Sequence, residues 1–121
     1  MKKIDEKIIA VLLTRNREDL LQEGLKGLFN QTVPINKILI VDSVSTDGTF
    51  ETLNDKGILN RSNIKYIKLN DNKGPSGGFA EGIKHAMKEN PTWVWILDDD
   101  IFPQETCLEN LLKFKQISHC I

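Results

Sequence analysis

Four short apolar runs alternate with amphipathic segments along the chain, and this alternation restricts the possible folds more than any other feature. The runs are rich in Ile, Val, Leu or Trp, which is typical of strands buried in a parallel sheet. They predict strands over residues 8–13, 35–41, 64–69 and 93–97. Strands that alternate with helices form right-handed βαβ units. We therefore predict an α/β fold with a mainly parallel sheet and helices on both faces.

A helix is predicted after each strand. The first covers residues 18–30, with Asn16 as its N-cap. The second is short, and the third and fourth repeat apolar residues at helical spacing. The run over residues 93–97 contains no polar residue, so we expect this strand to be buried on both faces of the sheet.

Three consecutive carboxylates, Asp98, Asp99 and Asp100, follow the last strand. Each ionised Asp raises the cost of ionising the next, and a divalent cation would offset this repulsion. Side chains alternate along a strand, so Asp98 and Asp100 should lie on one side and Asp99 on the other. The alternative is a solvated acidic turn in which Asp100 caps the next helix and Pro103 lies in its first turn. The triplet alone leaves both interpretations open.

Polar residues also follow the other three strands. Thr14 and Arg17 come after the first, Asp42 closes the second, and Asn72 follows the third. In open α/β sheets the ligand crevice lies beyond the carboxyl ends of the strands, where the strand order reverses. Asp42 fits a ligand contact there as well as it fits a loop carboxylate that precedes the cap of the next helix.

Glycines cluster after the third strand, but they match neither G-x-G-x-x-G nor a phosphate loop that ends in Gly-Lys-Ser/Thr. Dehydrogenase and P-loop interpretations are therefore disfavoured. The glycines could allow close helix packing, or they could expose backbone N–H groups at a helix N-terminus to a diphosphate. Their spacing favours neither role.

The chain of 121 residues predicts a single domain, 1–121. Its net charge is −1 and its Lys and Arg residues are scattered, so nucleic acid is not expected as a partner. No apolar run approaches the roughly 20 residues needed to span a bilayer, and the first residues lack a secretory pattern. The expected location is cytoplasmic.

Four ordered segments carry a family resemblance: VLLTRNR at 11–17, IVDSVSTDGT at 40–49, NKGPSGGF at 72–79 and WILDDD at 95–100. Together they resemble the family 2 glycosyltransferases, most of all the rhamnosyltransferase and galactofuranosyltransferase branch. The resemblance implies the GT-A fold, a Rossmann-like nucleotide-binding domain. It also implies inverting transfer of a sugar from a UDP or dTDP sugar, with Mg²⁺ or Mn²⁺, to a glycan or lipid-linked acceptor in cell-wall or polysaccharide biosynthesis.

The resemblance also implies roles for single residues. Asp100 would coordinate the metal directly, and Asp98 would face the ribose or reach the metal through water. The substrate-binding residues that the resemblance implies are Thr14 and Asp42 around the base and ribose, Arg17 near the nucleotide or diphosphate, Asn72 and a Gly77–Gly78 turn in the donor pocket, and Asp98 and Asp99. One departure is Ser43-Val44, where the family often has Asn-Ala or Asn-Ser, and we expect it to affect local packing alone.

Family members normally continue well past the Asp motif, with the acceptor site and the catalytic base. We therefore expect this chain to be a truncated donor half, with no catalytic residue to name, because a base must reach the acceptor hydroxyl. Apolar surface uncovered in this way would favour self-association into a homo-oligomer. Peripheral membrane association is a further expectation for the full-length enzyme.

Two other functions are alternatives to a glycosyltransferase for a chain with this predicted fold. A sugar nucleotidyltransferase would carry a glycine-rich basic loop after the first strand, and residues 14–17 contain no glycine. A non-catalytic nucleotide-binding or assembly module would keep the fold without the chemistry.

Overall fold

The computed structural model describes residues 6–118, with side chains as far as Phe114. It confirms the predicted succession of strands and helices and adds one short 3₁₀ helix, η1. In chain order the elements are β1 (Ile8–Thr14), α1 (Glu18–Phe29), β2 (Lys37–Asp42), α2 (Thr49–Asp55), η1 (Ile58–Asn60), β3 (Ile64–Lys68), α3 (Gly74–Met87), β4 (Trp93–Asp98) and α4 (Cys107–Ser118).

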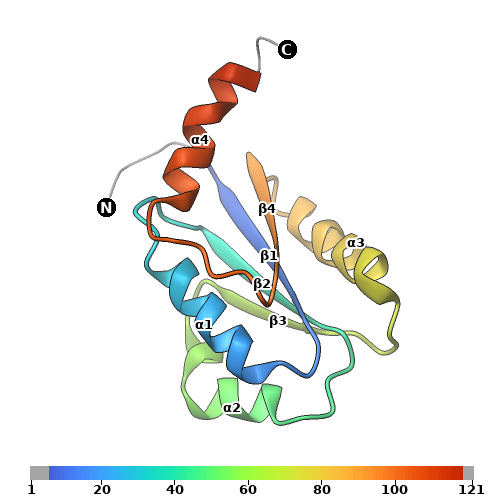
Figure 1. Cartoon of the computed structure of the whole chain (residues 1–121). Coiled ribbons are helices and arrows are strands. Elements are labelled where there is room, and N and C mark those ends of the chain that lie inside the picture. The colour runs from blue at the N-terminus through green and yellow to red at the C-terminus, as the bar shows by residue number, and fades with distance from the viewer. Residues whose placement is uncertain (1–5, 119–121) are drawn as a thin grey trace.

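The four strands form one parallel sheet with the order β3-β2-β1-β4. Strand β1 is central, and its residue Leu13 pairs with Val41 on one side and Asp98 on the other. The chain builds outward through β2 and β3 and then returns across the sheet to β4 (Figure 1). The strand order therefore reverses between β1 and β4.

Helices cover both faces of the sheet, as predicted (Figure 1). On one face, Leu12 and Ile40 pack in a buried cluster with apolar residues of α1 and α2. On the other face, Val11 and Val41 pack with Ala86 of α3. Each fully buried side chain of this size contributes about 1.5–3 kcal/mol. The alternating sides of β1 and β2 thus supply the centre of the fold.

The prediction that the last strand is buried on both faces is wrong. Strand β4 pairs only with β1 among the described residues and lies at the edge of the sheet. Trp93 is 38% exposed and Ile96 is 46% exposed, whereas every residue of β1 is buried. Trp95 packs with Leu108 near the start of α4. The apolar run therefore forms an edge strand, and exposed apolar side chains continue beyond it at Ile101, Phe102, Leu111 and Phe114.

The glycines of α3 allow close packing against the sheet. A Cβ on Gly78 would lie 2.6 Å from Leu13 Cδ1, and one on Gly82 would lie 2.4 Å from Val11 Cγ1. These distances leave no room for a side chain at either position. The predicted Gly77–Gly78 turn is wrong, because α3 already begins at Gly74 and both residues lie inside it.

The described helices are too short or too polar to cross a lipid bilayer.

Val44, between β2 and α2, has φ +58°, a conformation that is rare for a β-branched residue. Hydrogen bonds on both sides hold it there: Ser43 N donates to Thr14 O at 2.9 Å, and Ser45 N donates to Asp42 Oδ1 at 2.9 Å. The structure thus locates strain at one of the two residues, Ser43 and Val44, where the sequence departs from the pattern that it resembles.

We expect Val44→Gly to stabilise the chain by about 1 kcal/mol, because relief of this strain exceeds the entropic cost of glycine. Thermal denaturation should show a melting temperature that is a few degrees higher. Ser62→Gly is the matched control, since Ser62 is an exposed turn residue without a positive φ and should be slightly destabilised. A melting temperature for Val44→Gly below that of the unaltered chain would show that the backbone at Val44 does not store this strain.

Candidate functional site

A cleft of about 330 Å³ opens at the carboxyl ends of β1 and β4. This is where the strand order reverses, which is the usual place for a ligand in an open α/β sheet. Among the residues that line it are five that the sequence singles out: Thr14, Arg17, Asn72, Asp98 and Asp99. The other lining residues are Leu13, Arg15, Ser43, Gly74 and Pro75.

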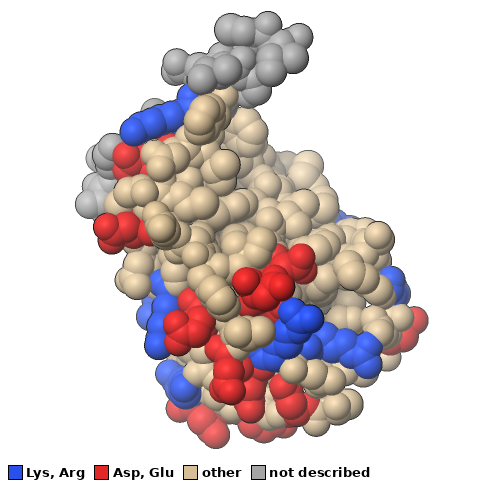
Figure 2. Space-filling view, in the orientation of Figure 1, with Lys and Arg blue, Asp and Glu red and all other residues tan. Residues whose placement is uncertain are grey.

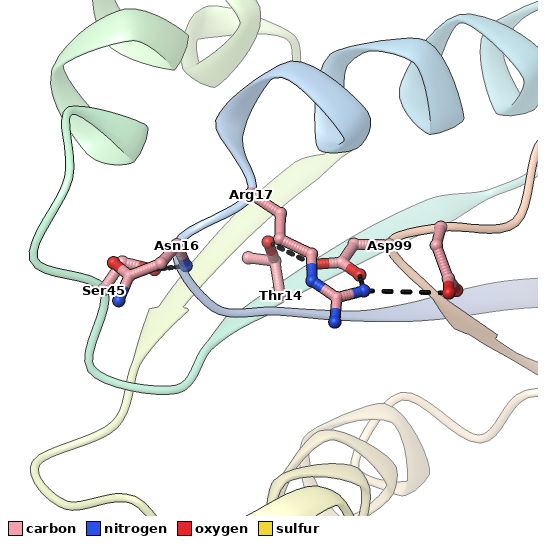
Figure 3. Close-up of polar contacts among 6 residues, drawn as sticks. Thr14, Asn16, Arg17, Ser45 and Asp99 are labelled. Atoms are coloured by element: carbon pink, nitrogen blue, oxygen red, sulfur yellow. Dashed lines mark hydrogen bonds and ion pairs between the residues drawn. The ribbon is translucent and has the colours of Figure 1, made fainter.

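Asp99 is the buried anchor of the cleft, at 5% exposure. Its Oδ2 accepts a hydrogen bond from Thr14 Oγ1 at 3.0 Å, and its Oδ1 accepts one from Arg17 Nη1 at 3.2 Å (Figure 3). A carboxylate removed from water is stabilised by such partners. Asp99 therefore connects the end of β4 to the end of β1 and to the first residue before α1.

The exposures of the acidic triplet alternate, but β4 ends at Asp98 and the next two residues form a turn, so the strand alternation predicted for the triplet does not extend to Asp100. Asp98 and Asp100 are exposed on either side of buried Asp99. Asp100 lies in a turn that Ile101 N closes by donating to Asp98 O at 3.2 Å, and its Oδ2 is 3.7 Å from Arg17 Nη1. Because α4 begins only at Cys107, the alternative that Asp100 caps the next helix is wrong.

Asp98 lines the cleft, whereas Asp100, two positions further on, is not among its lining residues. Two such exposed carboxylates suit a hard cation, since Mg²⁺ sites use one or two carboxylates together with substrate phosphates. Among the described side chains, no group of three or more His, Cys, Asp or Glu residues is arranged to hold a metal. Asp98 and Asp100 are the carboxylates that would hold such an ion, because both of Asp99's oxygens already have protein partners.

Asp42 is buried beneath the neighbouring loop, at 2% exposure. Its Oδ1 accepts from Ser45 N at 2.9 Å, and its Oδ2 accepts from the hydroxyl of Tyr66. Burial, followed by the hydrogen bond and charge of Asp42, raises the pKa of Tyr66 well above its usual value, so this hydroxyl remains a donor. Asp42 thus fixes the β2–α2 loop against β3, and its contact with the base or ribose stays a prediction.

Asn16 joins two loops instead of capping a helix, so its predicted N-cap role is wrong. The N-cap of α1 is Arg17, which makes no side-chain cap hydrogen bond. Asn16 Oδ1 accepts from Thr46 N at 2.6 Å and Asp47 N at 3.1 Å, and Asn16 N donates to Ser45 Oγ at 3.0 Å (Figure 3). The β1–α1 and β2–α2 loops therefore form one hydrogen-bonded unit beside the cleft.

Asn72 enters the cleft from the β3–α3 loop. Its Oδ1 accepts from Ser43 Oγ at 3.1 Å and from Gly74 N at 3.0 Å. Because this oxygen already accepts two hydrogen bonds, the side-chain amide nitrogen of Asn72 is the group that can donate to a ligand. Gly74, at φ +72°, lines the cleft where the sequence analysis expected Gly77 and Gly78.

Arg15 also lines the cleft, although no role was predicted for it from the sequence. It directly follows Thr14, so its position next to a predicted site residue was the available signal. Figure 2 shows Lys and Arg side chains directly beside Asp and Glu on this face of the molecule. The cleft therefore combines groups that can bind a cation with groups that can bind an anion.

Comparison with known proteins gives relatives that include glycosyltransferases and a polysaccharide synthase by name. The galactofuranosyltransferase GlfT1 of Mycolicibacterium smegmatis is 28% identical over 107 residues, which cover 88% of this chain and 34% of GlfT1. The poly-beta-1,6-N-acetyl-D-glucosamine synthase of Staphylococcus epidermidis is 30% identical over 95 residues, covering 78% of this chain and 22% of the synthase. The chain thus spans about a third or less of the length of these relatives.

Solved structures agree with the sequence matches. The crystal structure of S. aureus TarS 1–349 in complex with UDP-GlcNAc has a TM-score of 0.77 and 26% identity, covering 93% of this chain and 32% of that one. The fold is therefore the α/β fold of the GT-A glycosyltransferases, as predicted. The sequence model of glycosyl transferase family 2 matches residues 9–118, and the chain belongs to that family.

Proposed function

We propose that this chain is the donor-binding part of an inverting, metal-dependent glycosyltransferase that uses a UDP or dTDP sugar. The observation that carries the proposal is the cleft between the ends of β1 and β4, where exposed Asp98 lies beside Arg15 and Asn72. The chain is similar over 93% of its length to TarS, which has been solved with UDP and with UDP-GlcNAc. These features support a nucleotide sugar as the ligand.

Asp98 and Asp100 would hold Mg²⁺ or Mn²⁺, which when bound offsets the charge that develops on the departing nucleoside diphosphate. Asp99 positions them, because its bonds to Thr14 and Arg17 fix the backbone between the two exposed carboxylates. Groups held in place before the reaction need no reorganisation when charge develops. The amide of Asn72, which lines the cleft from the β3–α3 loop, would orient the donor.

The acceptor in this proposal is a glycan or a lipid-linked sugar. It is supported by the names of the relatives, which include a galactofuranosyltransferase and a polysaccharide synthase. A cytoplasmic donor site, peripheral membrane association and a homo-oligomer belong to the same proposal.

Nuclear magnetic resonance tests where the donor binds. In ¹⁵N-labelled chain titrated with UDP and Mg²⁺, we expect the backbone amides of Thr14, Ser43, Gly74 and Asp98 to shift together and to saturate. Inorganic phosphate at the same concentration is the control for simple charge effects. Shifts confined to the groove between α1 and η1, around Leu20, would show that the proposed site is wrong.

A further inference from the structure

Two guanidinium groups line the cleft, but among the described residues only that of Arg17 interacts with other side chains. Arg17 donates to Asp99 at 3.2 Å and lies 3.7 Å from Asp100. Arg15 is exposed, lines the same cleft and makes no hydrogen bond or ion pair with any other described residue. The two cations, although two positions apart, are therefore not equivalent.

Arg17 also lines the cleft, but its Nη1 is held by Asp99, a carboxylate that is 5% exposed. A ligand that drew this guanidinium away would leave the buried carboxylate without its cation. A buried charge that loses its partner is strongly destabilised, more so than an exposed one. Arg17 is therefore better suited to holding the acidic turn than to binding a ligand.

The backbone of Arg15 is fixed on both sides. Thr14 is 1% exposed and is bound to Asp99, and Asn16 is bound to Ser45, Thr46 and Asp47 across the loop. Only the side chain of Arg15 remains to be ordered when a ligand binds. Such partial pre-organisation lowers the entropic cost of binding.

We propose that Arg15, rather than Arg17, is the side-chain cation that contacts the diphosphate of the nucleotide donor. This inference rests on the proposed function. A guanidinium presents paired donors that match phosphate oxygens. It would also offset the repulsion between the phosphates and the exposed carboxylate of Asp98, which lines the same cleft.

Calorimetric titrations of UDP and of uridine with Mg²⁺ test the assignment. Arg15→Ala should weaken UDP binding about tenfold or more, because a charge-assisted contact is lost. It should leave uridine binding and the melting temperature unchanged, and Arg15→Lys should recover part of the UDP affinity. Lys68→Ala is the matched control, since Lys68 is an exposed cation at the end of β3 that does not line the cleft.

Each result has a defined meaning. Unchanged UDP affinity in Arg15→Ala would overturn the inference while leaving the proposed function standing. Equal losses for UDP and uridine would also overturn it, because the contact would then be to the nucleoside. If the unaltered chain binds no UDP, the proposed function fails and the inference fails with it. Arg17→Ala should instead lower the melting temperature, and stability equal to that of the unaltered chain would contradict the division of roles.

Discussion

Asp99→Ala is expected to destabilise the chain by about 2–3 kcal/mol, the largest stability change within the acidic triplet. The change leaves the buried hydroxyl of Thr14 without its acceptor and removes the nearer carboxylate of Arg17. This destabilisation is small for a buried ion pair because the Arg17 side chain is 51% exposed to solvent. Thermal denaturation should show a melting temperature that falls by roughly 10 °C.

Asp98→Ala and Asp100→Ala are the matched controls, since both residues are exposed members of the same triplet. Their melting temperatures should equal that of the unaltered chain or exceed it slightly, because each change relieves repulsion between carboxylates. Asp99→Asn should fall between Asp99→Ala and the unaltered chain, since its amide oxygen can still accept from Thr14. A larger loss of stability in Asp100→Ala than in Asp99→Ala would contradict the anchoring role.

Asp100→Ala should leave the melting temperature nearly unchanged and should remove the effect of the metal on nucleotide binding. We expect the affinity for UDP in the presence of Mn²⁺ to fall about tenfold or more, to the level measured without the ion, because a hard cation at this site would have only one or two carboxylate ligands from the protein. Without Mn²⁺ the affinity for UDP should change little. Calorimetric titration of folded Asp98→Ala, Asp99→Ala and Asp100→Ala variants separates the three positions.

Asp99→Ala should weaken this metal-dependent binding less than Asp100→Ala, because the oxygens of Asp99 already accept from Thr14 and Arg17. If Asp99→Ala is the more damaging to binding, the direct metal ligand is Asp99 and the assignment of Asp100 is wrong.

The secondary structure followed from sequence because its signals are local. Apolar runs and helical spacing located all four strands and the helices on both faces. The burial of β4 did not follow, because an apolar run looks the same in a central strand and in an edge strand. Which strands lie beside it depends on pairing between residues that are far apart in sequence, such as Leu13 with Asp98.

The site was predicted in part for the same reason. Residues that end strands could be placed at one edge of the sheet, and five of them do line one cleft. Their partners could not be predicted. Asn16 fits a local cap, yet it binds Thr46 and Asp47, about 30 positions away. The link between Tyr66 and Asp42 likewise needs β3 folded beside β2. Long-range hydrogen bonds therefore determine which side chains fix the loops. Arg15, which we propose as a ligand contact, makes none of them.

Titration of UDP into the unaltered chain, with and without Mn²⁺, tests most directly whether the cleft is a metal-supported nucleotide site. We predict saturable binding of one UDP per chain that strengthens about tenfold or more when Mn²⁺ is added, because Asp98 and Asp100 would hold an ion that offsets the charge of the diphosphate. No binding of UDP, or the same affinity with and without Mn²⁺, would contradict that site.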